Sequence, residues 1–233
     1  MDVIRTQFAF DRAHAHIPPM RSALLAILAP VLALTVTACS QTGVDPACFN
    51  RTSEKIGGPF SLTSHTGARM TEDNFKGRKT MVFFGFTHCP DVCPNTLYAV
   101  GTAMTMLPKN VKKPMVAFIS VDPARDTPEE LSRYIASNGF PSDITGLTGT
   151  LEELQQVSDG FGAPFSRVED EDSASGYLMD HMAIVYLMDE NWKLATYFPL
   201  GEKPEQMAQC IAALDLERGA LQERDAADDD PER

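Results

Sequence analysis

The chain has 233 residues, of which 43% are hydrophobic, which is enough for one well-buried core and short for two. Its formal net charge is −12. A surface this acidic repels phosphate backbones and anionic headgroups, so no nucleic-acid partner is expected, and a cationic partner or a metal ion suits it better.

The residues that follow Met20 have the order of a secretion signal. Arg21 is followed by an apolar stretch over 23–36 and then by small residues that end at Cys39. Residues before Met20 lack the basic composition of a signal start, so translation is expected to begin at Met20. The sequence VTAC that ends at Cys39 resembles the lipobox of bacterial lipoproteins, whose cysteine is acylated after cleavage.

This pattern predicts how the chain is divided. Residues 1–38 are expected to be a removed signal segment, and 39–55 a polar spacer held by lipid on Cys39 at the periplasmic side of a bacterial membrane. An uncleaved transmembrane anchor is the alternative, and it also keeps the domain outside the cytoplasm. A single domain is expected over 56–216. The tail over 217–233 is dense in Asp, Glu and Arg and is expected to be disordered.

The first half of the domain begins with a predicted hairpin over 59–74, with its turn at the sequence SHTG. A strand apolar on both faces follows at 80–86, which indicates a buried central strand. A helix is expected over 94–107, and a second buried strand over 115–121.

The second half starts with a helix expected from Thr127 to about Gly139, and another helix starts at Thr150. Strands are expected over 182–188 and 193–198, and a last helix over 203–216. This order predicts an α/β protein with a central mixed sheet flanked by helices and an N-terminal hairpin. The arrangement resembles the thioredoxin-like fold, which places reactive cysteines between its first central strand and the next helix.

Cys89 and Cys93 fall at that position, separated by three residues and flanked by prolines. Their spacing places the two sulfurs on one side of the first helical turn. Unpaired N–H groups and the helix dipole stabilise thiolate there, and thiolates are soft ligands for Cu(I), zinc or iron–sulfur clusters. The alternative is a pair of buried structural cysteines.

A third ligand is less evident from the residues alone. His181 follows Asp180 and precedes an apolar strand, where an acidic neighbour can orient its ring. A single histidine is, however, more often a structural residue than a ligand. His88 is expected to point away from the sulfurs, and His65 to lie exposed in a turn.

Three ordered motifs together resemble the Sco/SenC family over residues 56–216. They are GFTHCPDVCP at 85–94, VDPARDTP at 121–128 and DHMAIVYLMD at 180–189. Met182 departs from the serine that commonly follows the histidine of the third motif. Strand alternation predicts that its side chain faces away from the metal.

The resemblance implies a thioredoxin-like protein that binds copper through Cys89, Cys93 and His181. It further implies a metallochaperone, rather than an enzyme, that delivers copper to the subunit carrying the binuclear copper centre of cytochrome c oxidase. Ligand exchange would transfer the metal, and the disulfide form of the cysteine pair would not hold it. The second motif is expected to support the site, with Asp126 either orienting it or facing the partner.

Three other functions remain open at this point. A thiol–disulfide oxidoreductase acting on the oxidase's cysteines is disfavoured by the three-residue spacing and by the absence of proline between Pro164 and Pro199. A structural zinc module requires four ligands, and three are found. A copper or redox sensor is not excluded by any feature of the sequence.

Two cysteines remain after Cys39 is assigned to the lipid and Cys89 and Cys93 to the metal. Cys48 lies in the spacer and Cys210 in the closing helix, and a disulfide between them would tie the spacer to the end of the domain. The alternative is that Cys210 is a small buried hydrophobe in a helical stripe with Met207, Ile211 and Leu214.

Overall fold

The computed structural model describes Cys48, Ser53, residues 55–170 and residues 176–228, with side chains through Leu216. The chain divides into two units, Met1–Gln41 and Thr42–Arg233, and the first lies wholly outside the described residues. The expected signal segment, the acylated Cys39 and most of the spacer therefore lie outside them too. None of the helices in the described part combines the length and hydrophobicity needed to cross a membrane.

A seven-stranded mixed sheet forms the centre of the domain, in the order β2-β1-β5-β4-β3-β8-β9. The central strands β3, β4 and β5 run parallel, and the outer strands pair antiparallel. The strands are β1 (Ser61–Ser64), β2 (Arg69–Thr71), β3 (Thr80–Gly85), β4 (Met115–Ser120), β5 (Ile144–Thr148), β8 (Val185–Met188) and β9 (Leu194–Phe198).

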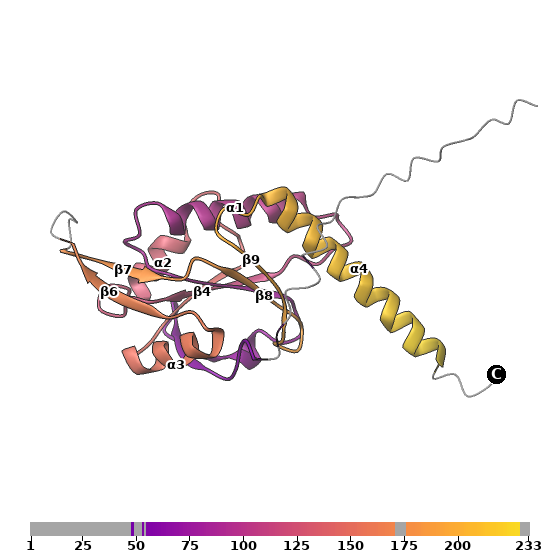
Figure 1. The fold of residues 1–233 in the computed structure, drawn as a ribbon, viewed down its shortest axis with the longest axis horizontal. Coiled ribbons are helices and arrows are strands. Elements are labelled where there is room, and N and C mark those ends of the chain that lie inside the picture. Colours follow the sequence, from indigo (N-terminus) through magenta and orange to yellow (C-terminus); the bar gives the residue numbers. More distant parts are fainter. Residues whose placement is uncertain (1–47, 49–52, 54, 171–175, 229–233) are drawn as a thin grey trace, which may run out of the picture. The chain divides into compact units, whose positions relative to one another are not determined.

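Helices cover both faces of this sheet: α1 and α4 lie on one side and α3 on the other (Figure 1). The helices are α1 (Val92–Met106), α2 (Pro128–Ile135), α3 (Leu151–Phe161) and α4 (Pro204–Asp228), with a short 3-10 turn, η2 (Glu72–Asn74). The hydroxyls of Thr127 and Thr150 accept from Glu130 N and Glu153 N, so both predicted helix starts are confirmed.

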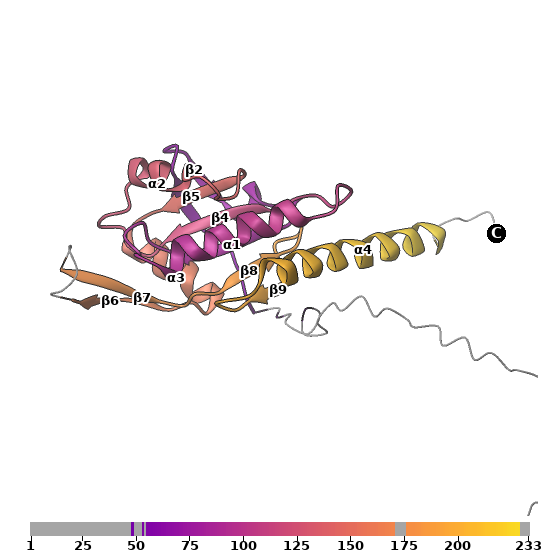
Figure 2. The same ribbon diagram turned by 90° about the horizontal axis from the view of Figure 1, so that it is seen from above.

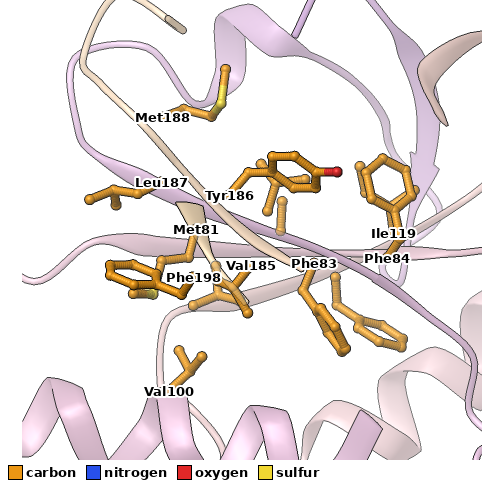
Figure 3. Close-up of a cluster of buried hydrophobic side chains, with 14 of the residues drawn as sticks. Met81, Phe83, Phe84, Val100, Ile119, Val185, Tyr186, Leu187, Met188 and Phe198 are labelled. Carbon is orange, nitrogen blue, oxygen red and sulfur yellow. The ribbon is translucent and has the colours of Figure 1, made fainter. Parts of the chain in front are cut away.

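The core is built on β3, every residue of which is buried. Alternate side chains point to opposite faces of the strand: Met81 and Phe83 lie toward α1, whereas Phe84 packs on Phe161 of α3 with ring centroids 5.4 Å apart (Figure 3). This is why the sequence of β3 is apolar without alternation. The sheet position immediately before the cysteine loop is therefore held rigidly from both sides.

A separate two-stranded sheet, β6 (Phe165–Glu169) and β7 (Tyr177–His181), extends away from the main sheet (Figures 1 and 2). The sequence did not predict this hairpin, because β6 is solvated on both faces and lacks hydrophobic alternation. The position of His181 also differs from the expectation that a strand follows it directly. His181 ends β7, and the next strand begins only at Val185.

Two helix ends also differ from those expected. Helix α2 ends at Ile135, before the Gly139 signal, because Gly139 instead lies in the following turn with a positive φ of 86°. Helix α4 continues to Asp228, which corrects both its expected end at Leu216 and the expected disorder over 217–228. That stretch is rich in Ala, Glu and Arg, which have high helix propensity even where they are charged.

Cys48 and Cys210 form a disulfide bond in the structure, with their Cα atoms 5.8 Å apart and 162 positions apart in the sequence. Both cysteines are buried, and Cys210 sits among the apolar side chains of α4, including Met207 and Ile211. An isolated bridge between Ser53 and Leu194 attaches the same N-terminal segment to β9. The start of the domain is thus fixed to its C-terminal elements at two points.

Candidate metal centre

Cys89, Cys93 and His181 meet at the end of β3. One donor atom from each, two sulfurs and one imidazole nitrogen, lies within 4.8 Å of the other two. Cys93 Sγ and His181 Nε2 are 3.7 Å apart. Within the ranges that the structure describes, no other cluster of three or more His, Cys, Asp or Glu side chains brings its donors this close.

The turn from β3 into α1 positions the two cysteines. Helix α1 begins at Val92, so Cys93 lies in its first turn and its N–H donates to Cys89 Sγ over 3.3 Å. Gly85 makes room for this arrangement. A Cβ at Gly85 would lie 2.9 Å from Cys93 Sγ and 2.7 Å from Phe118 Cε2, closer than real side chains approach.

The surroundings of the two thiols shift their pKa values in opposite directions. The pKa of Cys89 is lowered to about 4, chiefly because the Cys93 thiol donates to it, with a further contribution from the Cys93 N–H and against burial, which acts to raise it. The pKa of Cys93 is raised by the neighbouring Cys89 thiolate and by burial. At neutral pH the pair therefore holds one proton, on the buried Cys93, and Cys89 is the half-exposed thiolate.

The imidazole of His181 is oriented by backbone and by aromatic rings. Its Nδ1 lies 3.3 Å from the carbonyl oxygen of Met182, which accepts only from a protonated Nδ1, so the lone pair is on Nε2 and faces Cys93. Phe83 and Phe86 contact the ring edge-on, with centroids 6.4 and 5.8 Å away. The expectation that Asp180 orients the His181 ring is wrong. The Asp180 side chain is exposed, and the Met182 carbonyl orients the ring instead.

Asp126 braces the cysteine loop from the neighbouring motif. Its carboxylate accepts from the Thr87 N–H at 3.1 Å, the Thr87 hydroxyl at 2.6 Å and the Ser120 hydroxyl at 2.6 Å. Burial raises the pKa of Asp126, and these three donors oppose that rise. Because Asp126 is fully buried, it orients the loop and does not face a partner.

The other two histidines lie apart from this cluster. His88 is exposed, and its Nδ1 is 3.0 Å from the Thr87 hydroxyl. His65 is half-buried, not exposed as expected, because its Nδ1 accepts from Gly146 N at 3.2 Å. That contact joins the β1–β2 turn to β5 and is structural.

The structure adds residues that the sequence did not single out. Phe86 contacts the ring of His181, and Tyr177 shares the face of β7 that carries His181. Phe86 lies inside the first motif, where its apolar character was a signal. Tyr177 lies on a strand that was not predicted, so no pattern pointed to it.

A mixed sheet between helices, with a dithiol at the first strand–helix turn, defines a thioredoxin-like protein. A histidine from a separate hairpin completes this site with a third soft or borderline donor. The chain belongs to the SCO1/SenC family, whose model matches residues 50–215. The family and the α/β, thioredoxin-like fold that the motifs predicted are both confirmed.

Solved structures and sequences of relatives agree with this assignment. ScoI of Arabidopsis thaliana with copper bound is 34% identical, with a TM-score of 0.65, over 70% of this chain and 99% of that one. ScoI of Bradyrhizobium japonicum with copper bound is 37% identical, with a TM-score of 0.60, over 68% of this chain and 99% of that one.

Among curated sequences, the protein sco1 of Schizosaccharomyces pombe is 38% identical over 167 residues, 70% of this chain. The human mitochondrial SCO1 homolog is 38% identical over 162 residues, 67% of this chain. The matches span 62% and 52% of those two relatives' own lengths. The likeness thus covers the folded domain and not the whole of either relative.

Proposed function

We propose that this protein binds one copper ion through Cys89, Cys93 and His181 and delivers it to the binuclear copper centre of cytochrome c oxidase. The observation that carries the proposal is the convergence of two sulfurs and one imidazole nitrogen within 4.8 Å. Thiolate and imidazole are donors that Cu(I) and Cu(II) accept, whereas a structural zinc site calls for four protein ligands. Two structures of relatives contain copper.

Binding and release follow from the two thiols' different states. Cys89 meets the metal already as thiolate, whereas Cys93 must release its proton to solvent when its sulfur coordinates copper. Cys89 is half-exposed and Cys93 is buried, so an incoming cysteine or histidine of the partner reaches the Cys89 side first. Each new partner bond replaces one bond to this protein, and the copper keeps its charge.

The redox state of the pair controls this cycle. Oxidation to a disulfide removes two electrons from the pair, together with the one proton that Cys93 holds at neutral pH, and leaves sulfurs without thiolate charge. The disulfide form therefore loses two of the three ligands. Copper loading then requires a reduced pair in a compartment that oxidises exposed thiols.

A thiol–disulfide oxidoreductase acting on the oxidase's copper-site cysteines is the second candidate. One observation favours it: Cys89 combines a pKa of about 4 with partial exposure beside a resolving Cys93, which is the arrangement of an attacking thiolate. Against it, His181 is directed by its Nδ1 contact to present a lone pair to Cys93, which suits a ligand more than a mixed disulfide.

We further propose that lipid on Cys39 holds the domain at the periplasmic side of a bacterial membrane. The lipobox-like sequence VTAC supports this anchor. The disulfide between Cys48 and Cys210 supports an oxidising compartment, because such bonds seldom persist in a reducing cytosol. Mass spectrometry of the mature N-terminus tests it: an unmodified Cys39 with the upstream segment attached would mean a transmembrane anchor.

Oxidase activity in a strain lacking this gene separates delivery from reduction. Delivery predicts that added copper restores the activity and that added thiol reductant does not. The reverse result would identify the oxidoreductase. Complementation with His181→Ala sharpens the test, because that change removes a metal ligand and leaves both thiols in place.

A further inference from the structure

The hairpin that carries His181 is not bonded into the main sheet. In the part of the chain that the structure describes, strands β6 and β7 pair only with each other and extend away from the main sheet (Figure 2). Three residues separate His181 from β8. A two-stranded ribbon of this kind is marginally stable unless side chains hold it to the rest of the domain. The position of His181 Nε2 therefore depends on how the base of the hairpin is attached.

Tyr177, the first residue of β7, makes a polar attachment there, beside the packing of Phe165, Leu178 and Met179 against the core. Its hydroxyl donates to Asp122 Oδ1 at 3.0 Å, across 55 positions of sequence, and its side chain is buried. The guanidinium of Arg125 lies 3.7 Å from the centre of its ring, and that of Arg167 lies 3.9 Å away. The ring is thus held by cations from the Asp122–Asp126 loop and from strand β6.

Arg125 links the same loop to the cysteine side of the site. It forms an ion pair with Asp122, donates to the Tyr177 carbonyl at 3.4 Å and lies 5.8 Å from the ring of Phe86. Phe86 in turn contacts the His181 ring and accepts from the Cys89 N–H. One loop therefore braces the dithiol through Asp126 and the histidine strand through Asp122 and Arg125.

Strand geometry carries the constraint from Tyr177 to His181. Residues four apart in a strand point to the same face, so fixing the Tyr177 side chain fixes the face on which His181 projects. We propose that Tyr177 is a residue that positions His181 for metal binding. Its hydrogen bond to Asp122 holds β7 so that the His181 ring stays beside Cys93. This inference rests on the proposed copper site and deepens it.

The substitution Tyr177→Phe tests the inference, because it removes the hydroxyl and keeps the ring between the two arginines. Copper affinity of the reduced full chain in detergent, measured by Cu(I) competition with a chelator, should fall about tenfold, the size expected for one hydrogen bond to a carboxylate. Tyr98→Phe is the matched control, since Tyr98 is exposed on α1, and it should leave the affinity unchanged.

The same substitution in a His181→Ala background decides whether Tyr177 acts through His181. The two changes should not add: once His181 is absent, Tyr177→Phe should cost nothing further. An equal tenfold loss in both backgrounds would overturn the inference. If His181→Ala alone leaves affinity unchanged, the proposed ligand set itself fails, which is a different result.

Hydrogen exchange of the metal-free protein gives a readout independent of copper. Tyr177→Phe should speed exchange of the backbone amides of β6 and β7 and leave those of β4 unchanged. Unchanged exchange in the hairpin, together with unchanged copper affinity in the presence of an effective His181→Ala control, would show that Tyr177 does not position the histidine.

Discussion

The two cysteine pairs of this domain show how surroundings decide what the same side chain does. Cys48 and Cys210 are far apart in sequence, both buried, and joined as a disulfide. Cys89 and Cys93 are four residues apart, unbonded, and share one proton beside an imidazole. The first pair closes a loop of the chain, whereas the second forms, with His181, the proposed copper site.

Local geometry explains the difference. Cys210 is buried within the hydrophobic core cluster, and burial in apolar surroundings disfavours a thiolate. Cys89 accepts hydrogen bonds from the Cys93 thiol and from the Cys93 N–H in the first turn of α1, and both favour the charged sulfur. Stability and metal binding should therefore be separable properties of the two pairs.

Removing one sulfur of the unbonded pair should have the largest effect. Cys93→Ser should weaken copper binding by orders of magnitude, because a serine hydroxyl is a poor ligand for Cu(I). Chelator competition with the reduced protein measures it, and Cys210→Ser, measured alongside, should retain tight binding. Tight copper binding by Cys93→Ser would show that this sulfur is not a ligand.

Opening the other pair should affect stability instead. The entropy model for a closed loop of this length gives about 4–5 kcal/mol as an upper figure, and the Cys48→Ala, Cys210→Ala double variant should lose about 2–5 kcal/mol. Urea unfolding, with Cys89 and Cys93 kept reduced, measures the change in the free energy of unfolding. Unaltered stability of the double variant would contradict a stabilising role of the disulfide. A parallel loss of copper affinity in the folded variant would show that the two pairs do not act separately.

Adding a side chain at Gly85, which lies against Cys93, should have an intermediate effect on copper affinity. In Gly85→Ala, the added methyl group meets Cys93 Sγ and Phe118, so one of them must shift, and copper affinity should fall about tenfold. Gly149→Ala is the control, because its methyl group meets Glu153 and Leu62, away from the sulfurs. Equal copper affinities in the two variants would mean that the Gly85 contact does not position Cys93.

The smallest expected effect is in the pH dependence of alkylation. Because the folded-state pKa of Cys89 is about 4, its thiolate persists as pH falls from 8 to about 5, and the alkylation rate should change little over that range. An ordinary thiol would slow about tenfold per pH unit below its pKa near 8.5. Such slowing between pH 8 and 6 would contradict the lowered pKa.

The sign of the accompanying stability change follows from the same shift. A lowered folded-state pKa means that the folded protein holds the Cys89 thiolate more tightly than the unfolded chain does. The stability it contributes is fully present above the unfolded pKa and is lost as pH falls through about 4. The coupled, raised pKa of Cys93 acts in the opposite sense at high pH.

The cysteine half of the site could be predicted from sequence because its determinants are contiguous. The apolar run of β3 leads directly into Cys89 and Cys93, so strand, turn and helix start are specified locally. The histidine half depends on contacts distant in sequence. Its hairpin is attached through contacts such as the bond from Tyr177 to Asp122, and strand β6 has no hydrophobic period of its own.

The fold shows the same division. Helix starts at Thr127 and Thr150 carry local capping signals and were predicted. Strand β5 contains Gly146, which weakens any strand pattern but lets Leu131 of α2 pack 3.2 Å from where a Cβ would lie. Past Leu216 the charge density of α4 is typical of a disordered tail, whereas its Ala, Glu and Arg residues have the helix propensity that continues the helix.

A titration of His181→Ala beside His88→Ala tests the central claim most directly. The wild-type chain and His88→Ala should each bind one Cu(I) per chain with the same affinity, because His88 is exposed and apart from the cluster. His181→Ala should bind more weakly by orders of magnitude, since Nε2 beside Cys93 is the third donor. Equal affinities for all three proteins would contradict the three-ligand copper site.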